Sequence, residues 1–284
     1  MRRKSVHRLF VVATGLCAVA AVALLVLIVW SIASRGWAAL SWSFFTGHMR
    51  EVGADGGIFH NLIGTLILLA TAAATSTPLA LAIALVHGVY LRHHRLRRFV
   101  GLGLTILNGV PSILFGLFGM IVFVQWLGWG KSWLTGGLLL GLMILPTVSV
   151  SLIERIASLP DRYLEAAAGL GLPTSRIIRS VILPQSLGGL LTGSLLGLAR
   201  AAGETAPIMF TATIFAGATI PQGIKESPGL SLPYHNFVLA QDRVDPAAGG
   251  RLWGAALVLL GLVLTLSLAA LPARLRLHEE AHDT

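Results

Sequence analysis

The chain has 284 residues, of which 55% are hydrophobic and only 12% are charged, and its mean hydropathy is +0.80. A soluble globular domain carries about 25% charged residues, so this chain has too much apolar surface for one water-soluble core. The composition therefore excludes an ordinary soluble enzyme and a disordered protein. The net charge of +9 does not call for a nucleic acid partner, because basic residues also hold the cytoplasmic loops of membrane proteins.

Seven stretches of the sequence, each at least 20 residues long, contain no Asp, Glu, Lys or Arg. A bilayer-spanning helix needs about 20 apolar residues, whereas a membrane β-barrel would show alternating segments of about 10 residues. The chain is therefore predicted to be an all-α polytopic membrane protein. The stretches are residues 9–34, 56–91, 99–130, 132–153, 180–199, 205–224 and 252–273.

The basic residues predict which ends of these helices face the cytoplasm. The first stretch follows a basic N-terminus and exceeds the 7–15 apolar residues of a cleaved signal peptide, so it is expected to remain as a signal anchor. Four arginines within residues 92–98 and four within residues 154–185 mark two cytoplasmic segments. The N- and C-termini are then both expected to be cytoplasmic, and the membrane to be a bacterial inner membrane.

The number of spans depends on residues 205–224. Only Arg200 to Glu204 separate this stretch from residues 180–199, and counting the charges on the two sides does not choose between six and seven spans. Composition favours six, because Pro207, Pro221 and four threonines suit backbone packed on protein better than a lipid-facing helix. The predicted organisation is an anchor helix and outer loop in residues 1–57, a membrane core in residues 58–273 and a tail in residues 274–284.

The first outer loop carries Trp37, Trp42, Phe44 and Phe45. Such aromatic side chains form an interfacial amphipathic segment or contact a partner protein. The interfacial location is the favoured interpretation, since aromatic rings gather at the headgroup level of membranes.

Two further patterns bear on catalysis. Residues His278 to His282 match the H-E-x-x-H zinc motif, but they lie in a polar tail beside the C-terminus, without a third ligand or a cleft. We therefore expect no metal site and no metalloprotease activity. The sequence also has no P-loop, so ATP hydrolysis has to come from another chain, and no cofactor is expected in this one.

The cytoplasmic segment 161–186 is predicted to form a helix–turn–helix. The first helix spans residues 161–170 and ends at Gly171, and the second begins at Pro173 and ends near Leu183 and Pro184. The helix–turn–helix has an apolar side and a charged side. The pattern alone leaves two roles open: docking into a groove on a soluble partner, or anchoring at the membrane surface.

This segment resembles the EAA loop of bacterial ABC importer permeases, with Val181 in place of the family's isoleucine. In that family the loop docks into the ATP-binding subunit and transmits its nucleotide-driven motion. The resemblance implies this coupling role for Glu165, Ala166, Ala167, Gly171, Leu183 and Pro184.

A charged pair falls within the next apolar segment. A helix that begins near Ser186 has risen only about 22 Å at Arg200, which is short of the ~30 Å hydrocarbon core. The helix is therefore expected to continue and to hold Arg200 and Glu204 within the membrane, where pairing at i, i+4 lowers the cost of the charges. Small residues that allow close helix packing share this face; they are Gly189, Gly193 and Gly197.

Two interpretations of the pair are open. Arg200 offers charge-assisted hydrogen bonds to an oxyanion on its way through the membrane, with Glu204 holding or releasing the guanidinium. Alternatively, the two residues form a structural ion pair that tethers the helix. The transport interpretation is favoured, because ionic groups at membrane depth are costly and mark substrate pathways.

The run from Arg200 to Pro207 resembles the RA-x-GETAP signature of phosphate ABC transporter permeases, and residues 107–117 and 61–66 resemble two other segments of that family. The Ala-Pro after Glu-Thr is similar to PstA-type subunits. The segment Leu271–Arg274 departs from the family pattern at the end of the last helix. The resemblance implies a six-helix, MetI-like type I importer fold. It also adds three weaker candidates for the substrate pathway, which are Thr205, Asn108 and Ser112. Asn108 and Ser112 have an alternative role, which is to satisfy backbone groups freed by Pro111.

The resemblance implies a permease subunit of an ATP-driven phosphate importer. Its partners would be a homologous PstC-type permease, a PstB-type ATP-binding dimer that holds ATP and Mg, a PstS-type periplasmic phosphate-binding protein and membrane lipid. Three alternatives remain at this point: the partner permease or a permease for another oxyanion, a secondary transporter or channel, and the metalloprotease of the tail motif.

Overall fold

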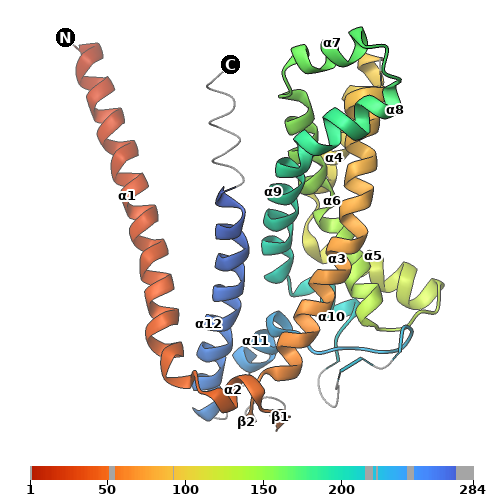
Figure 1. Cartoon of the computed structure of the whole chain (residues 1–284). Coiled ribbons are helices and arrows are strands. Elements are labelled where there is room, and N and C mark those ends of the chain that lie inside the picture. Colours follow the sequence, from red (N-terminus) through yellow and green to blue (C-terminus); the bar gives the residue numbers. More distant parts are fainter. Residues whose placement is uncertain are drawn as a thin grey trace.

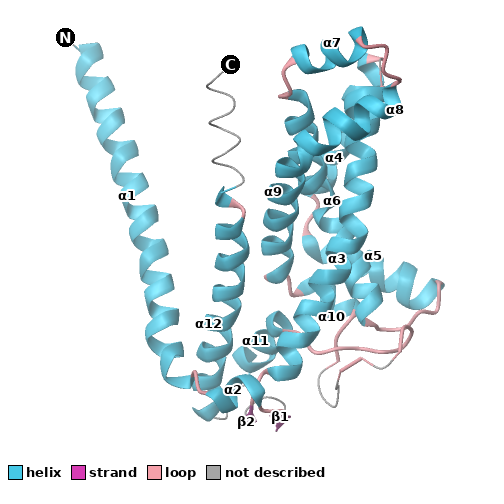
Figure 2. Ribbon diagram, in the orientation of Figure 1, coloured by secondary structure: helices cyan, strands magenta, loops and turns pink. Residues whose placement is uncertain are grey.

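The computed structural model describes residues 2–50, 55–91, 93–214, 220–221, 223–241 and 246–272. The described chain is almost entirely helical (Figures 1 and 2), apart from a two-stranded antiparallel sheet at one end. The long elements are α1 (Arg2–Gly36), α3 (Phe59–Leu85), α4 (His94–Gly109), α6 (Trp133–Ala157), α9 (Leu183–Ala202) and α12 (Pro246–Ala269). The short elements are η1 (Trp37–Ala39), α2 (Trp42–Thr46), β1 (Met49–Arg50), β2 (Asp55–Gly56), η3 (Val86–Tyr90), α5 (Ser112–Gly119), η4 (Met120–Trp126), α7 (Asp161–Gly169), α8 (Thr174–Ile177), η5 (Ile178–Ile182), α10 (Ala206–Thr211) and α11 (Leu232–Gln241).

The described residues contain five helices that are long and apolar enough to cross a membrane, and six if a strongly bent pair counts as one span. The bent pair consists of α4 and the helix formed by α5 and η4, with a bend of 93°. This agrees with the six predicted spans. Residues 205–214 contain only the short helix α10 followed by irregular backbone, as the prolines and threonines of that stretch predict.

The bend divides the third predicted apolar stretch, residues 99–130, into two helices. The helix α4 ends at Gly109, and Val110 is extended because a residue that precedes a proline avoids the helical conformation. Pro111 then stands just before α5, where its missing N–H costs no hydrogen bond.

The spans form a bundle around α6, and α1 stands apart from it (Figure 1). The helix α6 packs against α3, α4 and α9, while α12 packs against α9 and α11. The helix α1 meets α12 near Gly36, where Arg35 lies over the ring of Trp253 at 4.8 Å. The start of α1 and the α7–α8 segment lie at the same end of the molecule, and α12 runs toward that end (Figure 1).

The interior of the bundle is made by side chains of α6 together with small residues that let its neighbours approach. Leu139, Leu140 and Ile144 of α6 are fully buried. The glycines Gly137 and Gly141 of the same helix face threonines of α3, and larger side chains there would collide with Thr71 and Thr75. Burial of this kind contributes about 25 cal/mol per Å² of apolar surface where water is the alternative, but inside a bilayer close packing has to supply the stabilisation.

The predicted glycine face of α9 is the surface that packs on α6. A Cβ atom added to Gly189 would lie 2.6 Å from Cβ of Arg155, and one added to Gly193 would lie 2.8 Å from Cβ of Ser151. The hydroxyl of Ser151 donates a hydrogen bond to the carbonyl of Gly189 at 3.1 Å, and Gly197 faces Ile144. The absence of side chains at these positions therefore sets the separation of the two helices.

The end of α7 lies where the sequence predicts it. Gly171 has a φ of +69°, a conformation that costs a residue with a Cβ atom about 1–2 kcal/mol. The N–H of Leu172 bonds the carbonyl of Ala167 at 3.2 Å, and the N–H of Gly171 bonds that of Ala168 at 2.9 Å. These two bonds are a Schellman motif, and they terminate the helix before Pro173.

The second helix of this segment does not end near Pro184, contrary to the prediction. It starts at Thr174, widens into the π-helical turn η5 and continues directly into α9, so that residues 174–202 form one candidate span. A proline is tolerated here because it stands at the start of α9, next to a turn whose hydrogen bonds are already displaced.

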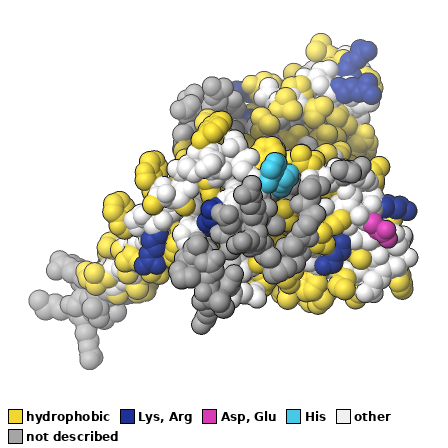
Figure 3. All heavy atoms as spheres, turned by 90° about the horizontal axis from the view of Figure 1, so that it is seen from below, with side chains coloured by type: hydrophobic (Ala, Val, Ile, Leu, Met, Phe, Trp, Pro, Cys, Tyr) yellow, Lys and Arg dark blue, Asp and Glu magenta, His cyan; other side chains and the backbone are white. Residues whose placement is uncertain are grey.

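The opposite end of the molecule is closed by the first outer loop and α11. Phe44 is buried against Ile58, Leu232 and Ala255, so its side chain packs on protein, while the interfacial location of the segment stays a prediction. Trp42 of the same helix, α2, is 82% exposed, so this helix is amphipathic. The hydroxyl of Ser41 caps the helix by accepting a hydrogen bond from the N–H of Phe44. Seen from this end, basic side chains lie scattered among hydrophobic and other uncharged groups (Figure 3).

His235 of α11 is buried beneath this surface. Burial lowers the pKa of His235 to about 4, and the nearby charge of Arg251 acts in the same direction. Arg251 itself donates a hydrogen bond to the carbonyl of Gly56, which ties α12 to the small sheet. The imidazole is therefore neutral near neutral pH in the folded chain.

The close approach of α6 and α9 predicts the effect of one added side chain. We expect Gly193→Leu to destabilise the protein by about 1–3 kcal/mol or more, because the new side chain overlaps Ser151 and the backbone of α6. Thermal unfolding of the purified protein in detergent measures this. The matched control is Gly261→Leu on α12, where an added Cβ meets nothing within 4 Å. Equal losses in the two variants would contradict the packing account.

The buried histidine predicts acid sensitivity. In the unfolded chain His235 has a pKa near 6.5, so below that pH the unfolded state binds a proton that the folded state takes up only near pH 4. Stability from this group is therefore complete above pH 6.5 and falls by about 3 kcal/mol as the pH drops to 4. The unfolding temperature measured across this range should fall less steeply in His235→Phe than in the wild type. The exposed control His94→Gln should keep the wild-type slope, and a wild-type slope in His235→Phe would contradict the prediction.

Candidate functional site

The candidate site lies at the last turn of α9. Arg200 stands three residues before Gly203, where the helix ends, and the N–H of Glu204 bonds the carbonyl of Ala201 at 3.1 Å. The expectation that one helix carries both Arg200 and Glu204 is therefore wrong. Pro207 gives the reason, because it has no N–H to continue the helical ladder and instead stands in the first turn of α10, which begins at Ala206.

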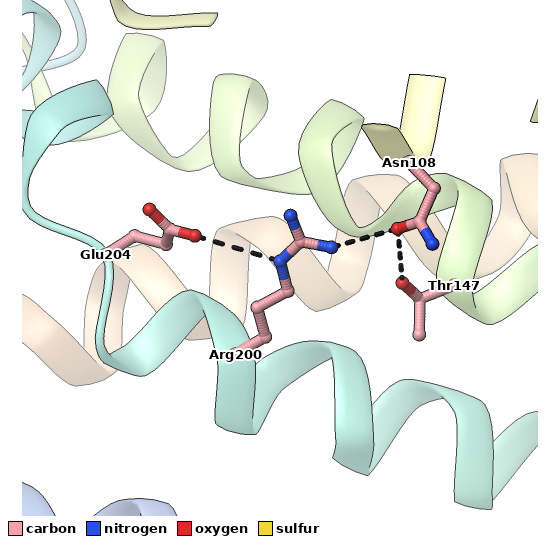
Figure 4. Close-up of polar contacts among 4 residues, drawn as sticks. All are labelled: Asn108, Thr147, Arg200 and Glu204. Carbon is pink, nitrogen blue, oxygen red and sulfur yellow. Dashed lines mark hydrogen bonds and ion pairs between the residues drawn. The ribbon is translucent and has the colours of Figure 1, made fainter. Parts of the chain in front are cut away.

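The predicted pairing of the two charges is nevertheless present (Figure 4). Nε of Arg200 lies 3.7 Å from Oε1 of Glu204. On its other side, Nη1 of Arg200 donates a hydrogen bond to Oδ1 of Asn108 at 2.9 Å. The hydroxyl of Thr147 approaches the same amide oxygen at 3.5 Å. The guanidinium of α9 is thus held by Asn108 of α4 and by Glu204, which follows α9, while Thr147 of α6 contacts the amide of Asn108.

The cluster lies near the middle of the bundle along its long direction. At about 1.5 Å per residue, Thr147 is about 21 Å from the start of α6 and about 15 Å from its end. Because α6 is one of the candidate spans, this position corresponds to the hydrocarbon interior of a membrane. The side chains of Arg200 and Glu204 are 37% and 18% exposed, so the pair faces open space in the isolated subunit.

Two helix breaks meet beside this cluster. Asn108 is the penultimate residue of α4, just before the 93° bend, and Arg200 precedes the break between α9 and α10. Beyond the breaks, α5 packs on α10, and an added Cβ at Gly116 would lie 3.0 Å from the carbonyl oxygen of Ala206. Broken helices in a membrane are tolerated where the freed backbone is buried in protein or lines a cavity.

The other predicted pathway residues lie nearby in the chain but are not bonded to the guanidinium. Thr205 precedes α10, and its carbonyl accepts the N–H of Met209 at 3.0 Å. Ser112 is the first residue of α5 and is half-buried. Within the described part of the chain, no hydrogen bond joins either residue to Arg200. Sequence reasoning missed Thr147, since a threonine inside an apolar stretch carries no signal of its own.

The predicted coupling residues lie at the opposite end of α9. Glu165 and Ala166 of α7 are exposed, whereas Ala167 is buried. Leu183 and Pro184 begin α9 and do not close the preceding helix. Beneath α7 and α8 is a cavity of about 280 Å³; its lining includes Gly88, Arg97, Ile156, Leu164, Thr174 and Ile177.

A metal centre has no support in the part of the chain that the structure describes, where no group of three or more His, Cys, Asp or Glu side chains could hold an ion. Residues 278–282, with the H-E-x-x-H pattern, lie outside the described residues. The predicted tail 274–284 lies outside them as well.

Comparison with known proteins identifies the family. Residues 76–277 match the family described as "Binding-protein-dependent transport system inner membrane component". The chain belongs to this family. It is therefore a multi-pass inner-membrane transport component and not an enzyme, and such permeases carry no cofactor of their own. Members work with a binding protein and an ATPase.

Named relatives cover most of the chain. The phosphate transport system permease protein PstA 1 of Mycobacterium tuberculosis (strain ATCC 25618 / H37Rv) is 33% identical over 255 residues, which are 87% of this chain and 80% of the relative. PstA of Xylella fastidiosa (strain Temecula1 / ATCC 700964) is 33% identical over 245 residues, 86% of this chain and 83% of the relative. The probable ABC transporter permease protein YqgI of Bacillus subtilis (strain 168) is 30% identical over 222 residues, 78% and 74% of the two chains.

A solved structure confirms the predicted permease fold. The inward-facing MetNI methionine ABC transporter matches with a TM-score of 0.58 and 15% sequence identity, covering 76% of this chain and 96% of the matched one. At this identity the likeness concerns the fold alone.

The exposure of the Arg200 side chain predicts how fast a cysteine thiol introduced at position 200 reacts. In a Cys17→Ser background, the Arg200→Cys variant should react with a small water-soluble thiol reagent at least about tenfold faster than Ala201→Cys, because the side chain of Arg200 is 37% exposed and Ala201 only 2%. The rates are measured on the permease in native membranes. Labelling of position 201 as fast as position 200 would contradict the described orientation of α9.

Proposed function

We propose that this chain is the PstA-type permease subunit of an ATP-driven inorganic phosphate importer. The observation that carries the proposal is the guanidinium of Arg200, held at mid-membrane depth by Asn108 and Glu204 and still partly exposed. The names of the relatives support phosphate as the substrate, since proteins 33% identical over 87% of this chain are phosphate transport permeases.

The chemistry of Arg200 suits a tetrahedral oxyanion. Its planar guanidinium offers several N–H donors in a fixed fork that matches the oxygens of phosphate. Asn108 takes one of these donors and Glu204 attracts a second, which leaves the group oriented but not saturated. A cation at this depth is costly, so its retention is explained by a substrate that it attracts into the membrane interior.

The coupling role falls to the segment 154–185. The exposed face of α7 with Glu165 and Ala166 contacts the ATP-binding subunit, and Gly171 provides the sharp turn that places α8 against it. The cavity beneath α7 and α8 leaves room for these helices to shift against the bundle. The movement then passes into α9 through Leu183 and Pro184, because α8, η5 and α9 are continuous.

The assembled importer contains this chain, a homologous PstC-type permease, a dimer of PstB-type ATPase subunits that holds ATP and Mg, and a PstS-type phosphate-binding protein outside. Each permease supplies half of the pathway. The α7–α8 segment and the start of α1 share one end of the molecule and α12 runs toward that end, which supports cytoplasmic termini (Figure 1). Residues 1–57 act as anchor and outer loop, residues 58–273 as the transport core and residues 274–284 as a cytoplasmic tail.

Replacing Arg200 tests the proposal. In cells whose own phosphate importer is deleted, the complete transporter carrying Arg200→Ala should take up labelled phosphate at least about 100-fold more slowly than the wild type, because the charge-assisted bonds to the anion are lost. Arg200→Lys should retain intermediate uptake, since it keeps the charge but not the fork.

Assembly has to be measured on the same variants. Co-purification of the ATPase and partner permease should be unchanged in Arg200→Ala, which separates a pathway defect from misfolding. Arg95→Ala, at an exposed arginine of α4 away from the site, is the matched control and should assemble and keep phosphate uptake. Normal phosphate uptake by an assembled Arg200→Ala transporter would overturn the role of Arg200 in the substrate pathway. A wild-type transporter that takes up no phosphate would overturn phosphate as the substrate.

A further inference from the structure

We propose that Glu204 makes the membrane site selective for oxyanions that still carry a proton. This inference rests on the proposed phosphate transport and names the form of anion that the Arg200 site accepts. It gives Glu204 a role beyond balancing the charge of Arg200.

The first step is the state of the carboxylate. Its closer oxygen, Oε1, lies 3.7 Å from Nε of Arg200, which is within ion-pair range but too long for a hydrogen bond. Among the described residues the structure gives the side chain of Glu204 no hydrogen bond. Its side chain is only 18% exposed, so the carboxylate lacks most of its water and needs a hydrogen-bond donor.

The second step is the direction of the free atoms. In Figure 4 the second oxygen of Glu204 and the second terminal nitrogen of Arg200 both point away from the bonds to their neighbours, and toward the same side. Nη1 of Arg200 is already taken by Asn108. The open side therefore presents one cationic donor beside one anionic acceptor.

The third step is the ligand that satisfies both groups at once. Near pH 7 inorganic phosphate keeps at least one P–OH group, whose proton can be donated to the carboxylate while another oxygen accepts from the guanidinium. Hydrogen arsenate has the same shape and the same protonated oxygen. Sulfate has lost both protons, so it would bring an acceptor oxygen against Glu204 with no hydrogen between them.

The size of the preference for phosphate over sulfate follows from the cost of placing a sulfate oxygen against the carboxylate of Glu204. Sites built to hydrogen-bond a substrate hydroxyl reject analogues that lack it by factors of up to about 10⁴–10⁵ when buried. Because Arg200 is 37% exposed, water screens the contact, and we expect a smaller factor of at least about tenfold.

Competition binding to the assembled transporter tests this inference without the binding protein, whose own selectivity would mask it. The permease–ATPase complex is purified in nanodiscs, loaded with labelled phosphate and titrated at pH 7 with unlabelled phosphate, arsenate or sulfate. In the wild type, arsenate should compete like phosphate, and sulfate should compete at least about tenfold more weakly. In Glu204→Gln the amide donates hydrogen bonds, so sulfate should gain at least about tenfold relative to phosphate.

Glu226→Gln is the matched control, because it makes the same change at an exposed carboxylate of the outer loop and should keep the wild-type ranking. An unchanged ratio of sulfate to phosphate in Glu204→Gln would overturn the inference, as would equal competition by sulfate in the wild type. Glu204→Asp keeps a carboxylate acceptor and should still reject sulfate. A Glu204→Asp transporter that no longer rejects sulfate would overturn the inference too. Failure of the wild-type complex to bind labelled phosphate contradicts the proposed function itself.

Discussion

The hydrogen bond between Arg200 and Asn108 is the constraint on which the inner architecture depends. It joins the last turn of α9 to the last turn of α4 at 2.9 Å, at the point where both helices break. A guanidinium in the membrane interior needs such partners, because lipid tails offer it no hydrogen bonds. The breaks are the means by which the chain brings partners from separate spans to one place, and the α5–α10 contact keeps them there.

Close packing supports this arrangement. In water, burial of apolar side chains would hold the helices together, but lipid tails are as apolar as leucine and provide no such drive. The bundle instead uses glycines of α6 against threonines of α3, and glycines of α9 against α6.

The sequence predicts the membrane class, the six spans and the end of α7 at Gly171, because apolar length, charge position and a glycine before a proline act locally. It also predicts the pairing of Arg200 with Glu204 and the contact face at Gly193. It fails where a distant contact decides. The π turn that carries a helix past Pro184, the bend at Pro111 and the burial of Phe44 each depend on neighbours from other elements. Thr147 could not be found for the same reason.

The unbroken run from α8 through η5 into α9 turns this part of the chain into a lever. Arg200 lies about 39 Å from Thr174 along it, at about 1.5 Å per residue. If the rod pivots at its cytoplasmic end, a rotation of about 5° sweeps the guanidinium through about 3 Å, which is the length of one hydrogen bond. Under the coupling role proposed for the α7–α8 segment, a small swing there would be enough to pull the cation off Asn108 without a relay of intervening side chains.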